Sequence, residues 1–246
     1  FRLVNAVNNK KSHLCIGLDI NPEGINNQNA RIDDLKFHTQ KIISATQDLA
    51  VAFKPNLGFY ERWGSEGFKW LEETMNSFEE DTLVIGDAKR GDIGNTAIQY
   101  AKSLFEHFGF DAVTLSPYMG LDSIAPFISD PKKGVFILCK TSNPSASDFQ
   151  NLLQNDKKVF ELVAEKCFKW NEKENVGLVV GATAPEEILS VRKYAPGLPF
   201  LIPGVGAQGG SLEKSIAYSG GSESYHMGPS WISGSTITEK SRGTYG

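Results

Sequence analysis

The chain has 246 residues, of which 40% are hydrophobic and 22% charged, and 25 basic against 29 acidic side chains give it a net charge of −4. These are ordinary values for a globular protein, and they exclude a disordered, collagen-like or coiled-coil chain. The slight acidic excess also argues against a general nucleic-acid binder. No apolar run approaches the roughly 18 residues that a membrane-spanning helix needs.

The three cysteines, Cys15, Cys139 and Cys167, lie far apart in the sequence. They match neither a zinc pattern nor a disulfide framework, and such a set is typical of a reducing compartment. The amino-terminal residues lack the long apolar stretch of a secretory signal. We therefore predict a cytoplasmic protein.

Short apolar runs alternate with longer amphipathic segments along most of the chain. Strands are predicted at 13–19, 51–56, 83–89, 112–117, 134–141, 176–183 and 200–205. Helices are predicted at 32–49, 67–78, 93–108, 122–128, 157–170, 186–194 and 212–218. The strands are apolar almost throughout rather than alternating, as expected where helices cover a parallel sheet.

Seven strand–helix pairs and an eighth strand predicted at 232–237 indicate an α/β fold, a (β/α)₈ TIM barrel with residues 1–246 as a single domain. The eighth helix is missing from this prediction because the sequence stops at Gly246, before such a helix could form. A doubly wound open sheet is the alternative. In a barrel, ligands bind at the carboxyl ends of the strands, so the residues there are the candidates for a site.

The densest charged cluster follows the third predicted strand. Asp87 and Lys89 are two residues apart and should leave a strand on the same face, and Asp92 lies where the next helix begins. A salt bridge and a helix cap would explain this spacing structurally. Lys54, at the end of the neighbouring strand, favours a functional interpretation, because four charges are costly to bury without a use. Such an array suits acid chemistry at carbon.

A glycine-rich segment, Gly204-x-Gly206-x-x-Gly209, follows the seventh strand. It matches the dinucleotide fingerprint formally, but no acidic residue clearly follows at the required distance. The last loops of a barrel commonly hold phosphate through backbone N–H groups. We therefore favour phosphate binding over a simple glycine turn, with the Gln208 amide and the Arg242 guanidinium as further ligands.

Together these segments resemble the orotidine 5′-phosphate decarboxylase family, in the form found in many bacteria and some protists. The matching segments are Phe53–Asn56, Asp87–Thr96, Tyr118–Gly120, Lys140–Pro144 and Pro203–Gln208. The resemblance implies decarboxylation of orotidine 5′-monophosphate to UMP and CO₂, the last step of de novo pyrimidine biosynthesis. It also implies a homodimer that needs no cofactor or metal and binds neither nucleic acid nor membrane.

By position, the resemblance makes Lys54, Asp87, Lys89 and Asp92 the catalytic residues, with Lys89 protonating C6 of the substrate. Binding of the substrate would fall to Asp19, Asn56, Ile93, Thr96, Ser142, Pro203, Gln208 and Arg242. Of these residues, Asp92, Ile93 and Thr96 would be contributed across the dimer interface.

Other interpretations stay open. A magnesium-dependent sugar-phosphate enzyme of the same superfamily would carry the same Asp-x-Lys-x-x-Asp spacing, and a barrel that binds nucleotides without activity would share the phosphate loop. Lys54, the segment around Ser142 and Gln208 favour a nucleotide, and the four charges favour an enzyme. A Rossmann dehydrogenase is a more distant alternative.

Overall fold

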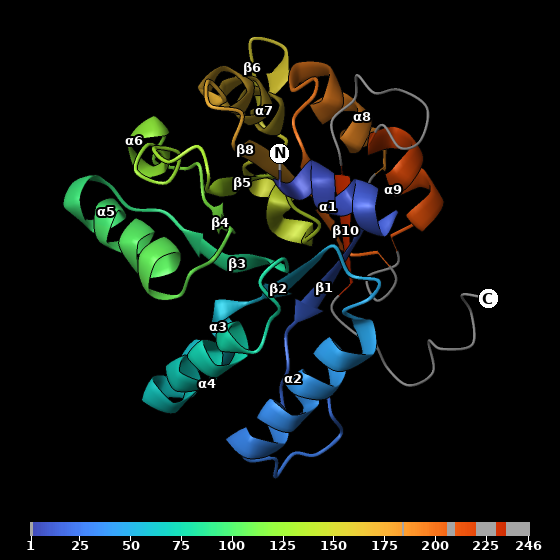
Figure 1. Cartoon of the computed structure of the whole chain (residues 1–246). Helices are drawn as coiled ribbons and strands as arrows, with labels where there is room; N and C mark the ends of the chain where they lie inside the picture. The colour runs from blue at the N-terminus through green and yellow to red at the C-terminus, as the bar shows by residue number, and fades with distance from the viewer. Residues whose placement is uncertain (1, 184, 206–209, 220–229, 235–246) are drawn as a thin grey trace.

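Eight parallel strands close into a barrel in the computed structural model of the chain, which describes residues 2–183, 185–205, 210–219 and 230–234 (Figure 1). The strands are β1 (Leu14–Leu18), β2 (Ala52–Pro55), β3 (Leu83–Arg90), β4 (Ala112–Leu115), β5 (Gly134–Lys140), β8 (Val176–Val180), β9 (Phe200–Pro203) and β10 (Ser230–Gly234). Around the barrel their order is β1-β10-β9-β8-β5-β4-β3-β2. This closed sheet confirms the predicted (β/α)₈ fold and excludes the open doubly wound sheet.

Helices follow most of the strands and surround the barrel. They are α1 (Arg2–Lys10), α2 (Ile32–Thr46), α3 (Leu57–Glu61), α4 (Gly64–Asn76), α5 (Gly94–Lys102), α6 (Leu121–Ile124), α7 (Val159–Trp170), α8 (Pro185–Tyr194) and α9 (Leu212–Ser219). A π-helical turn, η1 (Ser103–His107), continues α5, and a 3₁₀ turn, η2 (Pro144–Asp148), follows β5. No helix among the described residues is long and apolar enough to span a membrane.

Several predicted boundaries are wrong. The helix predicted at 93–108 is α-helical only to Lys102, and η1 then carries the chain to Gly109, whose positive φ of 75° ends the helix. The strand predicted at 232–237 begins earlier, at Ser230, and residues 235–237 lie outside the described part of the chain. The same holds for the rest of the carboxyl-terminal segment, so the missing eighth helix stays untested, as does the single-domain organisation.

The interior of the barrel is filled by one or two apolar side chains from each of seven strands. They are Cys15, Ala52, Leu83, Ile85, Ala112, Phe136, Val179 and Leu201. Ala6 and Val7 of α1 pack against this cluster, and Figure 1 shows α1 lying across the barrel. The sequence pattern did not predict α1, because its asparagine-rich sequence has weak helix propensity and tertiary packing stabilises it.

A short antiparallel hairpin was also not predicted. It pairs β6 (Leu153–Gln154) with β7 (Lys157–Lys158), in the connection between β5 and α7. Asn155 and Asp156 form its turn with positive φ angles of 48° and 62°, a conformation that these two residue types tolerate. The segment carries no alternating apolar pattern, so periodicity alone could not identify it.

Candidate functional site

Three charged side chains meet at the carboxyl ends of β2 and β3. Lys54 Nζ lies 2.8 Å from Asp87 Oδ2, and Lys89 Nζ lies 2.7 Å from Asp87 Oδ1. The Lys54 and Asp87 side chains are only 6% and 9% exposed, whereas that of Lys89 is 48% exposed. The structure therefore brings together three of the four predicted charges, with the carboxylate bridging two ammonium groups. We call Lys54, Asp87 and Lys89 the charge array.

The charge array keeps its buried members ionised. Burial disfavours the ionised Asp87 carboxylate, but Lys54 and Lys89 outweigh burial and lower its pKa from 3.8 to about 2. Burial likewise acts against the charged form of Lys54, and the charges of Asp87 and Asp19 overcome this effect and raise its pKa. The site thus holds a fixed negative charge between two positive charges.

Lys89 reaches Asp87 through an irregular backbone rather than through the regular strand that the sequence predicts. Its φ is +47°, in the left-handed region that lysine rarely adopts. The pairing of β3 with β4 shifts register between Gly86 and Arg90, so Lys89 lies in a bulge. The expected contact between Asp87 and Lys89 is present. It arises from the bulge, however, and not from the alternation of side chains in a regular strand.

Thr114, in β4, is a residue of the site that the sequence analysis missed. Its hydroxyl donates to Asp87 Oδ1 at 2.8 Å and accepts the backbone N–H of Lys89 at 3.0 Å. The only sequence signal was a hydroxyl side chain within the otherwise apolar strand Ala112–Leu115. Threonine is a common strand residue, so this signal was too weak to indicate a role.

Asp19 and Asn56 lie beside the charge array, at the ends of β1 and β2. The Asn56 side chain hydrogen-bonds to the Asp19 carboxylate and accepts the backbone N–H of Gly58 at 3.2 Å. Burial raises the pKa of Asp19, although Lys54 acts in the opposite direction. Asp19 Oδ1 is buried and has no hydrogen-bond partner within the described residues. A buried acceptor without a donor is suited to binding a ligand hydroxyl.

Asp92, the fourth predicted charge, makes no hydrogen bond or ion pair with the charge array among the described residues. Its Oδ1 accepts the backbone N–H of Ile93 at 2.8 Å. The structural alternative, a helix cap by Asp92, is not formed, because Ile93 is the N-cap residue of α5 and no side chain caps this helix. Ile93 and Thr96 are both exposed.

Ser142 lies in the connection between β5 and η2, and hydrogen bonds with Gln150 hold this connection in place. Gln150 Oε1 accepts the backbone N–H of Thr141 at 2.9 Å, and Gln150 Nε2 donates to Thr141 Oγ1 at 2.8 Å. Gly181, after β8, permits the close approach of this connection, since a Cβ there would lie 3.0 Å from Ser142 Cβ. Ser142 is thereby placed between the ends of β5 and β8. Gln150 is a second residue that the motifs did not indicate.

The predicted phosphate loop is described only at its two ends. Pro203 ends β9, and Gly210 N–H donates to Gly204 O at 3.1 Å, closing a loop directly before α9. Gln208 lies within the loop and Arg242 near the carboxyl terminus, and both fall outside the described residues. The fingerprint follows a late strand of a closed barrel, so the dinucleotide interpretation is not supported.

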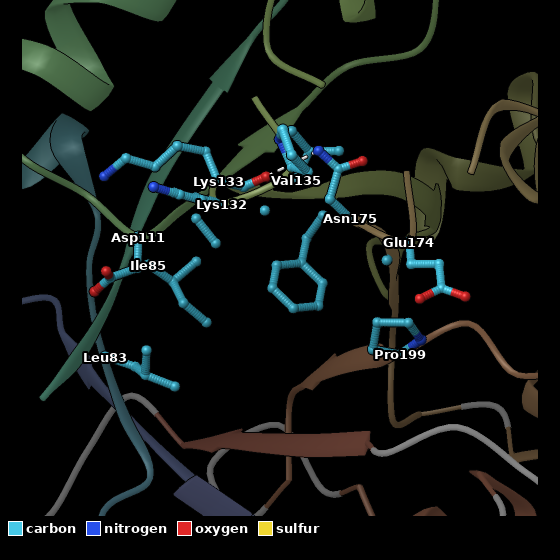
Figure 2. A pocket seen from close by; sticks show the side chains of 14 residues that line it. Leu83, Ile85, Asp111, Lys132, Lys133, Val135, Glu174, Asn175 and Pro199 are labelled. Carbon is cyan, nitrogen blue, oxygen red and sulfur yellow. Dashed lines mark hydrogen bonds between the residues drawn. The ribbon is translucent and has the colours of Figure 1, made fainter. Parts of the chain in front are cut away.

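Figure 2 shows a pocket at the opposite end of the barrel. It is lined by residues at the amino-terminal ends of β3, β4, β5 and β8, among them Leu83, Val135 and Gly177. In (β/α)₈ barrels this end contributes stability, while ligands bind at the other end. The charge array, at the carboxyl ends of the strands, is therefore the candidate active site.

Comparisons with known proteins agree with this geometry. A family model described as the orotidine 5′-phosphate decarboxylase / HUMPS family matches residues 12–223. An orotidine 5′-phosphate decarboxylase of Herpetosiphon aurantiacus is 48% identical to the chain over 221 residues, which are 87% of this chain and 82% of that protein.

Solved structures of an OMP decarboxylase and a UMP synthase also resemble the chain. The OMP decarboxylase of Leishmania donovani has a TM-score of 0.84 and 39% identity, over 95% of this chain and 88% of that one. The UMP synthase of the same organism has a TM-score of 0.85 and 41% identity over 95% of this chain, which spans 50% of that longer protein.

Proposed function

The chain belongs to the orotidine 5′-phosphate decarboxylase / HUMPS family, and from this premise we propose that it converts orotidine 5′-monophosphate to UMP and CO₂. It thereby acts as a carboxy-lyase in the last step of de novo pyrimidine biosynthesis. The observation that carries this proposal is the charge array, in which one buried carboxylate binds a buried and a half-exposed ammonium group at the catalytic end of the barrel.

The charge array suits the loss of CO₂ from C6 of the pyrimidine. The reaction leaves negative charge on a carbon with no adjacent ring position to delocalise it, so electrostatic stabilisation is decisive. Two unit charges about 3 Å apart gain roughly 5 kcal/mol at an effective dielectric constant of about 20. Lys89 supplies this positive charge and then the proton for C6. Asp87 faces the substrate carboxylate, and Lys54 holds Asp87 in place.

The remaining residues bind the nucleotide in this proposal. Asp19 and Asn56 hold the ribose, and Asp19 Oδ1, which has no partner among the described residues, accepts a hydrogen bond from a ribose hydroxyl. Ser142 contacts the pyrimidine ring. Pro203 precedes the phosphate loop, to which Gln208 and Arg242 are assigned by the family resemblance. Binding energy from the phosphate, remote from C6, orients the ring for reaction.

A homodimer would place Asp92, Ile93 and Thr96 in the partner subunit's site. Exposed hydrophobic side chains support this part of the proposal: they lie at the N-cap of α5, in α5, in the connection from β4 to α6 and in α6, and α5 and α6 are in contact. These side chains are Ile93, Ile98, Tyr118, Met119 and Leu121. Large exposed apolar side chains on neighbouring elements are typical of protein interfaces. The cytoplasmic location stays a prediction.

The decisive experiment follows the absorbance decrease of orotidine 5′-monophosphate on mixing with the protein, with and without EDTA. Rapid conversion to UMP that EDTA does not affect is the expected result. Loss of activity with EDTA would favour the magnesium-dependent sugar-phosphate alternative. Tight binding of UMP without any turnover would instead favour a nucleotide-binding barrel that lacks activity.

Subunit mixing tests the role of Asp92 across the interface. Asp92→Asn and Lys89→Ala proteins should each be nearly inactive. If Asp92 acts in the partner's site, each mixed dimer contains one intact site, and mixing should restore up to about a quarter of wild-type activity. Sedimentation shows whether the mixed proteins form dimers. If mixing restores no activity, Asp92 acts in the site of its own subunit.

A further inference from the structure

The bulge in β3 places Asp87 and Lys89 opposite a single residue of β4. Gly86 pairs with Val113 and Arg90 pairs with Leu115, so Asp87, Ala88 and Lys89 together face Thr114 alone. Bulges of this kind redirect side chains and commonly occur next to active sites. Thr114 is buried, and on its other side it pairs with Phe136 of β5.

The Thr114 hydroxyl bonds to the backbone of Lys89 and to the side chain of Asp87, both within the bulge. It accepts the Lys89 N–H, which would otherwise be a donor left without a strand partner. It donates to Asp87 Oδ1, the same oxygen that binds Lys89 Nζ at 2.7 Å. Backbone and side chain of Lys89 are therefore both tied to one hydroxyl and one carboxylate oxygen. Arg90, the next residue, is anchored by an ion pair with Glu61.

We propose that Thr114 is a positioning residue for decarboxylation, whose hydroxyl holds the left-handed Lys89 backbone and thereby aims the Lys89 ammonium group. This inference rests on the proposed function. A left-handed lysine persists only where its surroundings enforce it. Without the hydroxyl the bulge is free to relax. Small displacements of a catalytic group reduce the rate strongly, whereas nucleotide binding elsewhere in the site is retained.

Three variants separate positioning from stability. Thr114→Val keeps the shape but removes the hydroxyl, and Thr114→Ser keeps the hydroxyl. Thr39→Val is the matched control, because Thr39 is equally buried but its hydroxyl donates to Leu35 O within α2. We expect Thr114→Val to lower kcat at least tenfold, with KM and the Kd of UMP within threefold. Thr114→Ser and Thr39→Val should keep kcat within threefold, all values being corrected for the folded fraction.

Hydrogen exchange of the Lys89 amide supplies a readout that does not require activity. The amide should exchange slowly in the wild type and in Thr114→Ser, and faster in Thr114→Val. If Thr114→Val does not fold, Thr114→Cys, with a weaker hydrogen-bonding group, takes its place with the same expected direction.

The outcomes distinguish the two proposals. If the wild type is active, an unchanged kcat in Thr114→Val would overturn the role of the hydroxyl. Equal losses of kcat in Thr114→Val and Thr114→Ser would overturn it as well. A wild type that does not decarboxylate the substrate would contradict the proposed function instead. In that case the amide exchange still decides whether Thr114 holds Lys89, since equal protection in the wild type and Thr114→Val overturns it.

Discussion

Replacing Asp87 with asparagine should change how the stability of the protein depends on pH. The charge array lowers the pKa of the Asp87 carboxyl from 3.8 to about 2. This shift of about 1.8 units, at 1.36 kcal/mol per unit, corresponds to about 2 kcal/mol of unfolding free energy at neutral pH. A carboxyl whose pKa is lowered by folding stabilises the fold above its unfolded pKa. The contribution disappears as the pH falls through the folded pKa, and about half of it is lost at roughly pH 3.

Urea unfolding of the wild type and Asp87→Asn, at a series of pH values from neutral to acidic, measures this contribution. The wild type should be more stable at neutral pH, and its advantage should shrink by about 1 kcal/mol on reaching roughly pH 3. A constant offset is also expected, because the variant leaves the Lys54 ammonium group buried without its carboxylate. An advantage that stays the same at every pH would refute the reasoning, since it would mean that the Asp87 pKa is not shifted by folding.

Three further predictions concern other parts of the barrel. Lys89→Ala should abolish most of kcat while the Kd of UMP stays within a few fold, and near-wild-type turnover would disprove its role as proton donor. Asp19→Asn should stabilise the nucleotide-free protein at neutral pH, because burial raises the pKa of Asp19 and its ionised form therefore opposes folding there. The same variant should bind UMP more weakly in a titration, and a loss of stability would contradict this reasoning. Gly177→Ala should lower the unfolding free energy by about 1–3 kcal/mol without altering kcat, because a Cβ there would lie 2.7 Å from the Phe136 ring.

The barrel could be predicted because its strands are continuous apolar runs separated by amphipathic helices. That pattern follows directly from burying a parallel sheet beneath helices, so it is present in the sequence itself. Helix α1 is different, because its stability comes from contacts of Ala6 and Val7 with strands distant in sequence. Local propensity does not contain such contacts.

The candidate site likewise contains residues that the sequence predicts and residues that it does not. Lys54 and Asp87 could be predicted because each ends an apolar strand, and adjacent parallel strands end together. The bulge at Lys89 could not, because its register depends on a hydroxyl of the neighbouring strand. Thr114 looks like any strand threonine until that register is known. In the proposed homodimer, Asp92 reaches a site of the second subunit, which a single chain does not contain.

In the proposed reaction, the unequal exposure of the charge array determines where protons enter and leave. Asp87 uses both oxygens as acceptors, Oδ2 for Lys54 and Oδ1 for Lys89 and Thr114, and its low pKa keeps it ionised throughout the neutral range. Lys54 is sealed from solvent, whereas nearly half of the Lys89 side chain meets water. In the proposed reaction Lys89 gives its proton to the product, and its exposure lets it recover one from solvent while its two neighbours remain unchanged. The site is restored for the next turnover by a single exchange with water, without rearrangement of the buried charges.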